Sequence, residues 1–196
     1  MSYLELHESE IFKKYNNEQL LKDIASYRNG DGRLSKVLNH WFEECIYSCQ
    51  TKYEKSPIKA LQSDTDMEWI LNYIKSKPKF YNSNNEITNV KSFFRNGTRI
   101  ARKVANFRPK NARDIYFRYN DINGERINCL DTSAGFGSRM SAVLLSGHNY
   151  CGFDPNHDLQ IKLKDYLKWL RIHNVIEPTQ RCGLYEQGSE IHRPEL

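Results

Sequence analysis

The feature that most constrains the fold of this 196-residue chain is a change in the spacing of its apolar residues near residue 120. Before that point, apolar residues recur at the three-to-four-residue spacing of amphipathic helices. After it, short apolar runs of strand length alternate with longer helical patterns. The order strand, loop, helix, strand, helix, strand is typical of the start of a doubly wound α/β sheet. We therefore predict a helical subdomain over residues 1–105 and an α/β segment over residues 106–196.

The individual elements follow from the same patterns and from turn residues at their ends. Helices are predicted over residues 17–29, 34–53, 66–77, 91–107, 110–119, 138–147 and 156–174. Strands are predicted over residues 126–131, 148–154 and 179–187. Asn156 is expected to cap the last helix, because an Asn side chain at that position accepts a hydrogen bond from a first-turn backbone N–H.

The segment LDTSAGFGSR, residues 130–139, joins an acidic strand end to a glycine-rich loop. A loop of this kind at a helix N-terminus is a general nucleotide site, and Gly135 and Gly137 permit a tight turn close to a ligand. Met140 stands where a dinucleotide fingerprint has its third glycine. Asp131 would repel a pyrophosphate but suits a ligand with an ammonium and a sulfonium, while the helix N-terminus suits a carboxylate. S-adenosylmethionine (SAM) has this charge pattern.

A second acidic residue, Asp154, closes the second predicted strand in the segment CGFDPN. A carboxylate at that point of an α/β nucleotide site hydrogen-bonds ribose hydroxyls. The alternative is a structural role at the start of the following helix, which is common for Asp and Asn. The two roles are compatible, because Asn156 can cap the helix while Asp154 binds a ligand.

DTSAGFGSR followed by GFDPN resembles the two SAM-binding motifs of SAM-dependent DNA methyltransferases that methylate adenine N6 or cytosine N4. The resemblance implies a Rossmann-like methyltransferase fold, of which this chain carries the first, three-stranded half, with the helical subdomain as an N-terminal extension. It also implies that NFRPKNARDIY covers the methionine end of SAM and that Ser189 or Glu190 contacts its adenine. The SAM-binding residues expected in this way are Phe107, Pro109, Lys110, Asp131, Ser133, Ala134, Gly135, Phe136, Gly137, Asp154, Pro155 and Ser189.

The catalytic motif of that family, a polar residue followed by Pro-Pro and an aromatic residue, does not occur in this sequence. In the family it binds the target amine and stacks on the flipped base. We therefore assign no catalytic residue, and we expect the first strand, which pairs with the fourth in the complete fold, to lie at an exposed edge. The chain is interpreted as an N-terminal fragment, one subunit of a split enzyme, or a reduced SAM-binding protein. A second chain or a continuation would carry the catalytic motif.

Residues 91–113 contain eight basic and no acidic side chains, which makes them a candidate DNA-contacting surface. The residues expected to contact DNA phosphates are Lys91, Arg95, Arg99, Arg102 and Lys103. A solvated helix face fits the same pattern equally well. Arg139 is similarly balanced between an ion-pair partner within the protein and a ligand for the SAM carboxylate.

Other functional classes are disfavoured by composition. The five cysteines lack CxxC spacing and the histidines lack metal-ligand spacing, so neither a disulfide framework nor a metal site is expected. Without a membrane-spanning run or a signal peptide, the chain is expected in the cytoplasm. Besides the methyltransferase, two hypotheses remain open: a non-catalytic SAM-binding or DNA-binding subunit that acts by assembly, and a nucleotide-dependent oxidoreductase.

Overall fold

The computed structural model describes residues 11–30, 33–50, 55–75, 106–120 and 125–190. Their contacts divide the chain into two compact units, one of residues 1–14 and 43–105 and the other of residues 15–42 and 106–196. The expected boundary at residue 105 thus coincides with a unit boundary. Residues 15–42, however, group by their contacts with the α/β segment rather than with the helices that follow them. The basic residues expected to contact DNA, Lys91 to Lys103, lie outside the described residues.

The first unit contains α4 (Pro57–Leu61), α5 (Asp64–Lys75) and the end of α3 (Ser35–Ser48). Its core is a cluster of buried side chains from these elements and from the segment before them: Ile11, Phe12, Tyr47, Leu61 and Ile70. The short helix α4 begins at a proline and is capped by Ser56, whose side chain accepts a hydrogen bond from the Lys59 N–H. This helix was absent from the sequence prediction, because five residues are too few to show a period.

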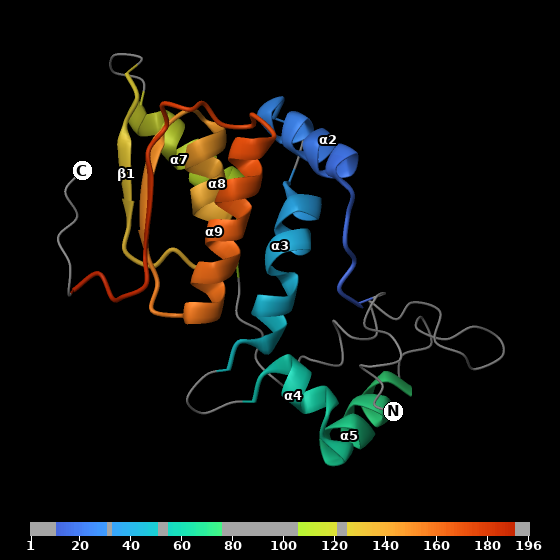
Figure 1. Cartoon of the computed structure of the whole chain (residues 1–196). Helices are drawn as coiled ribbons and strands as arrows, with labels where there is room; N and C mark the ends of the chain where they lie inside the picture. Colours follow the sequence, from blue (N-terminus) through green and yellow to red (C-terminus); the bar gives the residue numbers. More distant parts are fainter. Residues whose placement is uncertain (1–10, 31–32, 51–54, 76–105, 121–124, 191–196) are drawn as a thin grey trace. The chain divides into compact units, whose positions relative to one another are not determined.

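The second unit is an α/β structure with a three-stranded parallel sheet, which confirms the predicted class and strand direction. The sheet contains β1 (Asn128–Asp131), β2 (Asn149–Phe153) and β3 (Cys182–Tyr185), in the order β1-β2-β3. α8 (Ser138–Leu145) connects β1 to β2, and α9 (His157–Ile172) connects β2 to β3. α7 (Pro109–Asn120) precedes β1, and α2 (Asn17–Arg28) and the first part of α3, up to Phe42, also belong to this unit (Figure 1). All five residues of β2 are buried, as expected for the central strand of a parallel sheet.

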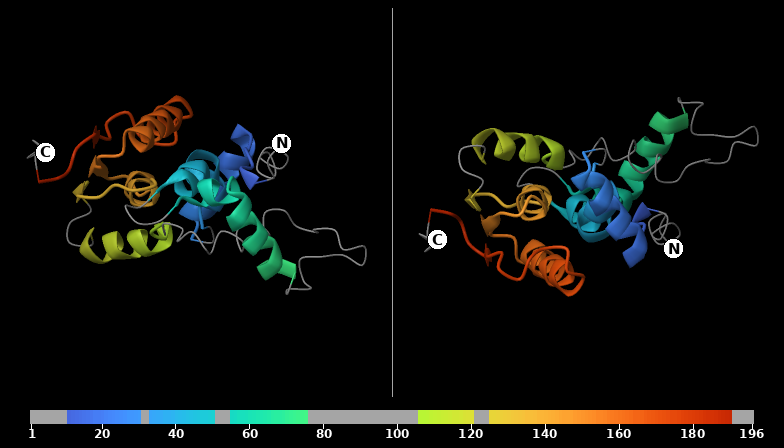
Figure 2. Two further views of the ribbon diagram at one scale, coloured as in Figure 1. Left: turned by 90° about the horizontal axis from the view of Figure 1, so that it is seen from below. Right: turned by 90° about the horizontal axis from the view of Figure 1, so that it is seen from above.

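The helices α7, α8 and α9 lie on one side of the sheet, with α7 outermost on the β1 side (Figure 2). The register pairs Cys129 with Tyr150 and Asp131 with Gly152, so these side chains share one face. Arg139 on α8 donates a hydrogen bond of 2.9 Å to the Asp131 carboxylate, so this face is the one that the helices cover. Burial also raises the pKa of Tyr116 on α7 to about 12. On the opposite face, Leu130 remains 50% exposed.

Aromatic packing ties the N-terminal helices of this unit to α9. The ring of Phe42 on α3 meets that of Tyr166 edge-on, with 5.6 Å between ring centroids. The Tyr166 hydroxyl lies 3.1 Å from the Ser141 hydroxyl of α8. Tyr27 on α2 donates a hydrogen bond of 3.0 Å to the carbonyl of Pro109, the first residue of α7. The helical segment before residue 43 is therefore part of the scaffold that holds the sheet.

The predicted cap of α9 is confirmed, because the Asn156 side chain accepts a hydrogen bond of 3.0 Å from the Leu159 N–H. We expect Asn156→Ala to lower the free energy of unfolding by about 1 kcal/mol, the usual cost of losing a cap. Asn156→Asp is the matched control and should keep most of the stability. Urea unfolding of both variants measures the difference, and equal losses would show that the cap does not stabilise the helix.

Candidate functional site

The glycine-rich loop, residues 132–137, lies between β1 and α8 at the carboxyl ends of the strands. Two backbone N–H groups fasten it to the end of β2. The Ala134 N–H donates to the carbonyl of Phe153 at 2.7 Å, and the Gly135 N–H donates to the Asp154 carboxylate at 3.0 Å. Because ligands of open α/β sheets bind at this edge, the structure brings both acidic residues and the loop to the expected position.

Asp154 connects the loop to the start of α9. One of its carboxylate oxygens accepts from the Gly135 N–H and the other from the Asn156 N–H, each at 3.0 Å. A carboxylate has about four acceptor positions, so Asp154 keeps positions for further donors. The side chain is partly exposed at the sheet edge. Asp154 therefore has both a structural role in the loop and the capacity to accept a hydrogen bond from a ligand hydroxyl.

Asp131, in contrast, has its acceptor positions filled within the protein. One oxygen accepts from the Ser133 N–H at 3.2 Å and from Arg139 Nη2 at 3.1 Å. The other accepts from Arg139 Nε and from the Tyr150 hydroxyl, both at 2.9 Å. These four donors use the full capacity of a carboxylate. Asp131 itself is only 9% exposed. A ligand ammonium can reach it only if one donor leaves.

Arg139, in the first turn of α8, is thus an ion-pair partner of Asp131, which was one of its two predicted roles. Burial disfavours the charged guanidinium, but the hydrogen bond and charge of Asp131 outweigh this, so the pKa of Arg139 is raised. Its guanidinium also donates to the Ser133 carbonyl and lies 5.6 Å from the centre of the Phe107 ring. Phe107 thus contacts Arg139 of α8, and its expected role in SAM binding stays a prediction.

The structure gives different reasons for glycine at the two loop positions, 135 and 137. Gly135 has a φ of +56° and Gly137 a φ of +70°, a backbone region that favours glycine. A side chain at Gly137 would also collide with the Phe42 ring, whose Cε2 atom would lie 2.4 Å from the added Cβ. The sequence argument gave Gly137 to the ligand, whereas its close approach is to a side chain of α3.

The N-terminus of α8 carries a polar atom that has no hydrogen-bond partner among the described residues. Gly137 is the N-cap residue and provides no side-chain hydrogen bond to the first turn. Next to it, Ser138 is 1% exposed, and its hydroxyl makes no hydrogen bond with any described residue. A buried hydroxyl is normally hydrogen-bonded, so this atom is an exception among the described residues. The first-turn N–H groups of α8, which have no partner within the helix, suit a polar ligand group at the helix N-terminus.

The end of β3 contributes an acidic residue that sequence reasoning missed. β3 ends at Tyr185, so Glu186 directly follows the strand, as Asp154 follows β2. The Glu186 carboxylate lies 2.7 Å from Nδ1 of His157, the first residue of α9. Gln160 holds the two strand ends together, because its side-chain amide donates to the carbonyls of Asp154 and Tyr185. The predicted strand ran two residues too far, to Gln187, and this concealed Glu186.

The remaining residues predicted to bind SAM lie at different distances along the chain from the glycine-rich loop and the two strand ends, some in the loop itself and others on α7 or beyond β3. Ser133, Ala134 and Phe136 lie in the loop, and Pro155 follows Asp154 at the surface. Pro109 is buried as the first residue of α7, and Lys110 is exposed in its first turn. Ser189 lies in a turn beyond β3. The residues with direct contacts around the loop and the two strand ends are Phe107, Asp131, Ser133, Ala134, Gly135, Gly137, Asp154, Arg139 and, as a residue that the sequence did not indicate, Tyr150.

Within the basic run of residues 91–113, the structure describes residues 106–113, and one of the arginines there has a structural role. Arg113 on α7 donates a hydrogen bond of 2.6 Å to the Tyr27 carbonyl, and its guanidinium lies 4.9 Å from the centre of the Tyr27 ring. Arg108 and Lys110 are exposed. Only the latter two are therefore available for phosphate contact in the part of the run that is described.

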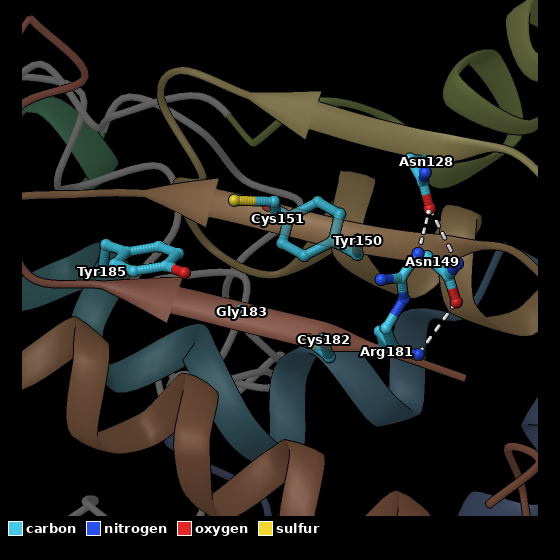
Figure 3. A pocket seen from close by; sticks show the side chains of 8 residues that line it. All are labelled: Asn128, Asn149, Tyr150, Cys151, Arg181, Cys182, Gly183 and Tyr185. Atoms are coloured by element: carbon cyan, nitrogen blue, oxygen red, sulfur yellow. Dashed lines mark hydrogen bonds between the residues drawn. The ribbon is translucent and has the colours of Figure 1, made fainter. Parts of the chain in front are cut away.

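A hollow of about 180 Å³ lies elsewhere on the sheet, on the face opposite the helices (Figure 3). Asn128, Cys151, Arg181 and Tyr185 are among its lining residues. The Asn149 side chain donates to that of Asn128 at 2.8 Å and accepts from the Arg181 backbone N–H at 2.8 Å. Neither Asp131, Asp154 nor the loop lines it, so this hollow is separate from the predicted SAM site.

No family model, curated protein or solved structure matches this chain. Within the described ranges, no group of His, Cys, Asp and Glu side chains has the arrangement of a metal site. The described helices include none that is both long and apolar enough to cross a bilayer.

Proposed function

We propose that residues 106–196 form the SAM-binding half of a DNA amino-methyltransferase, acting on adenine N6 or cytosine N4. The observation that carries the proposal is the pair of carboxylates, Asp131 and Asp154, at the carboxyl ends of adjacent parallel strands, with Gly135 of the loop bonded directly to Asp154. The parallel order β1-β2-β3, with its connecting helices on one face, supports it.

SAM would supply an electrophilic methyl group, and the residues of this chain would bind and orient it. Asp154 has free acceptor positions for the ribose hydroxyls. The first-turn N–H groups of α8 suit the ligand's carboxylate. Asp131 would bind the ammonium. Phe107, beside Arg139, would cover the methionine end.

A partner that completes the sheet belongs to the proposal. β1 pairs only with β2 among the described strands, and Leu130 on it is half-exposed. α7, the outermost helix on that side, also exposes Ile115 and Phe117. Apolar side chains on an unpaired strand and on the helix beside it favour coverage by further strands, from a second chain or a continuation. That part would carry the Pro-Pro-aromatic motif, and DNA phosphates would contact the basic residues Lys91 to Lys103.

Titration calorimetry with SAM, S-adenosylhomocysteine and NAD tests the proposal. We expect the two adenosyl ligands to bind and NAD not to bind. Asp154→Ala should weaken S-adenosylhomocysteine binding about tenfold or more, since it removes the proposed acceptor for the ribose hydroxyls and the hydrogen bond with the Gly135 N–H. Asp158→Ala, on the exposed first turn of α9, is the control and should bind as the wild type does. Binding of NAD in place of the adenosyl ligands would refute the proposal in favour of an oxidoreductase.

A further inference from the structure

The inference concerns how a ligand reaches Asp131, and it rests on the proposed function. All acceptor positions of the Asp131 carboxylate are filled, by Ser133, Arg139 and Tyr150. The ligand ammonium therefore cannot simply be added to this site. It must replace one of the three donors, and the structure distinguishes them by how easily each can leave.

Arg139 is the donor that can leave. The Ser133 donor is a backbone N–H fixed by the loop. Tyr150 is 2% exposed, and its ring lies over Gly152, where an added Cβ would be 2.6 Å from the ring. The side chain of Arg139 is 28% exposed and long enough to turn about several bonds. When Arg139 leaves Asp131, the charge of its guanidinium moves into water and is not buried. The free-energy cost is therefore small compared with that of moving the buried Tyr150.

Two further partners keep the guanidinium at the site, the Ser133 carbonyl, to which it donates, and the Phe107 ring. The Phe107 ring lies beside it at a cation–π distance, 5.6 Å from the ring centre. Arg139 can thus release Asp131 and stay next to the loop. In that position, the guanidinium can reach other groups of a ligand whose ammonium is bound to Asp131. In an α-amino acid, a carboxylate is attached to the same carbon as the ammonium.

We propose that Arg139 is the specificity residue for the amino-acid end of the ligand, by exchange of ion pairs. The ligand's ammonium replaces the Arg139 guanidinium on Asp131, and the guanidinium pairs with the ligand's carboxylate. Two ion pairs replace one pair and a solvated zwitterion, so no charge is left without a partner. The Asp131–Arg139 pair then selects zwitterionic ligands over ligands that carry an ammonium alone.

The ion-pair exchange predicts a result that would not be expected if Arg139 had a structural role alone. Without Arg139, Asp131 is open to an ammonium, but the ligand's carboxylate loses its cationic partner and keeps only the backbone N–H groups at the N-terminus of α8. Arg139→Met should therefore weaken S-adenosylhomocysteine binding about five- to tenfold. The same variant should strengthen binding of 5′-(3-aminopropyl)thioadenosine, the analogue that lacks the carboxylate, by about the same factor. The preference between the two ligands would invert.

Calorimetry with both ligands on the wild type, Arg139→Met and Arg139→Lys tests the proposal. Arg139→Lys keeps a positive charge but cannot form the two parallel hydrogen bonds of a guanidinium, so it should retain a reduced preference for S-adenosylhomocysteine. If the Met variant does not fold, the Lys variant provides the test in its place. Arg118→Met, which removes an exposed arginine near the end of α7, is the control and should leave both affinities unchanged. Parallel loss of both affinities, or no change in either, would overturn the exchange. If the wild type binds neither ligand, the proposed function fails as well.

Discussion

Replacing Gly137 by Ala is expected to lower the free energy of unfolding by about 2–4 kcal/mol, the largest stability effect that we predict for a single substitution. The backbone φ of +70° costs an L-residue about 1–2 kcal/mol. In addition, the new Cβ would lie 2.4 Å from Cε2 of Phe42. Phe42 is fully buried against Tyr166, so its ring cannot turn away without disturbing the packing of α3 on α9.

Gly147→Ala separates the two causes. Gly147 has a φ of +87°, but an added Cβ would meet nothing within 4 Å. This variant should lose only the backbone contribution, about 1–2 kcal/mol. Urea unfolding of both variants, followed by circular dichroism, gives the comparison. Equal losses would contradict the role given to Phe42, whereas a larger loss for Gly137→Ala supports it.

Asp131→Ala is expected to abolish binding of SAM and S-adenosylhomocysteine and also to destabilise the protein. The substitution leaves the Tyr150 hydroxyl buried without its acceptor, which costs about 1–3 kcal/mol. Burial, with the charge of Asp131, raises the pKa of Tyr150 well above its ordinary value, which favours the protonated hydroxyl that donates to Asp131. The loss of the Arg139 pair adds less, because Arg139 is partly exposed to water.

The control for Asp131→Ala is Asp165→Ala. Asp165 is an exposed carboxylate on α9, and its loss should change the free energy of unfolding by less than about 0.5 kcal/mol and leave ligand binding intact. Thermal unfolding and calorimetry give the two readouts. Unchanged ligand affinity in Asp131→Ala would refute the role of Asp131, whereas a loss of stability alone would leave it as a structural residue only.

The sequence predicted the second unit well because its signals are local. The three strands, their parallel direction, the glycine-rich loop and the Asn156 cap depend on residues close together in the chain. Less local features were missed. α3 ends at Ser48, short of the predicted residue 53. The membership of residues 15–42 in the α/β unit depends on contacts such as Tyr27 with Pro109, for which the sequence carries no signal.

The same distinction applies to the candidate site. The positions of Asp131 and Asp154 follow from strand ends and were predictable. The saturation of Asp131 was not, because Arg139 reaches it from the next helix and Tyr150 from the neighbouring strand through the register that pairs Asp131 with Gly152. Gly137 was attributed to a ligand because its real neighbour, Phe42, lies far earlier in the chain. Periodicity and motifs describe neighbours in sequence, and these contacts are neighbours only in space.

The central claim is that the edge formed by Asp131, the glycine-rich loop and Asp154 binds the methyl donor. Backbone chemical shifts recorded by NMR during a titration with S-adenosylhomocysteine test it most directly. The account predicts the largest shifts at Ser133 to Gly137, at Ser138 and at Asp154, with small shifts at Asn128 and Arg181, which line the hollow of Figure 3. Shifts confined to Asn128, Cys151 and Arg181, with the loop unchanged, would contradict it.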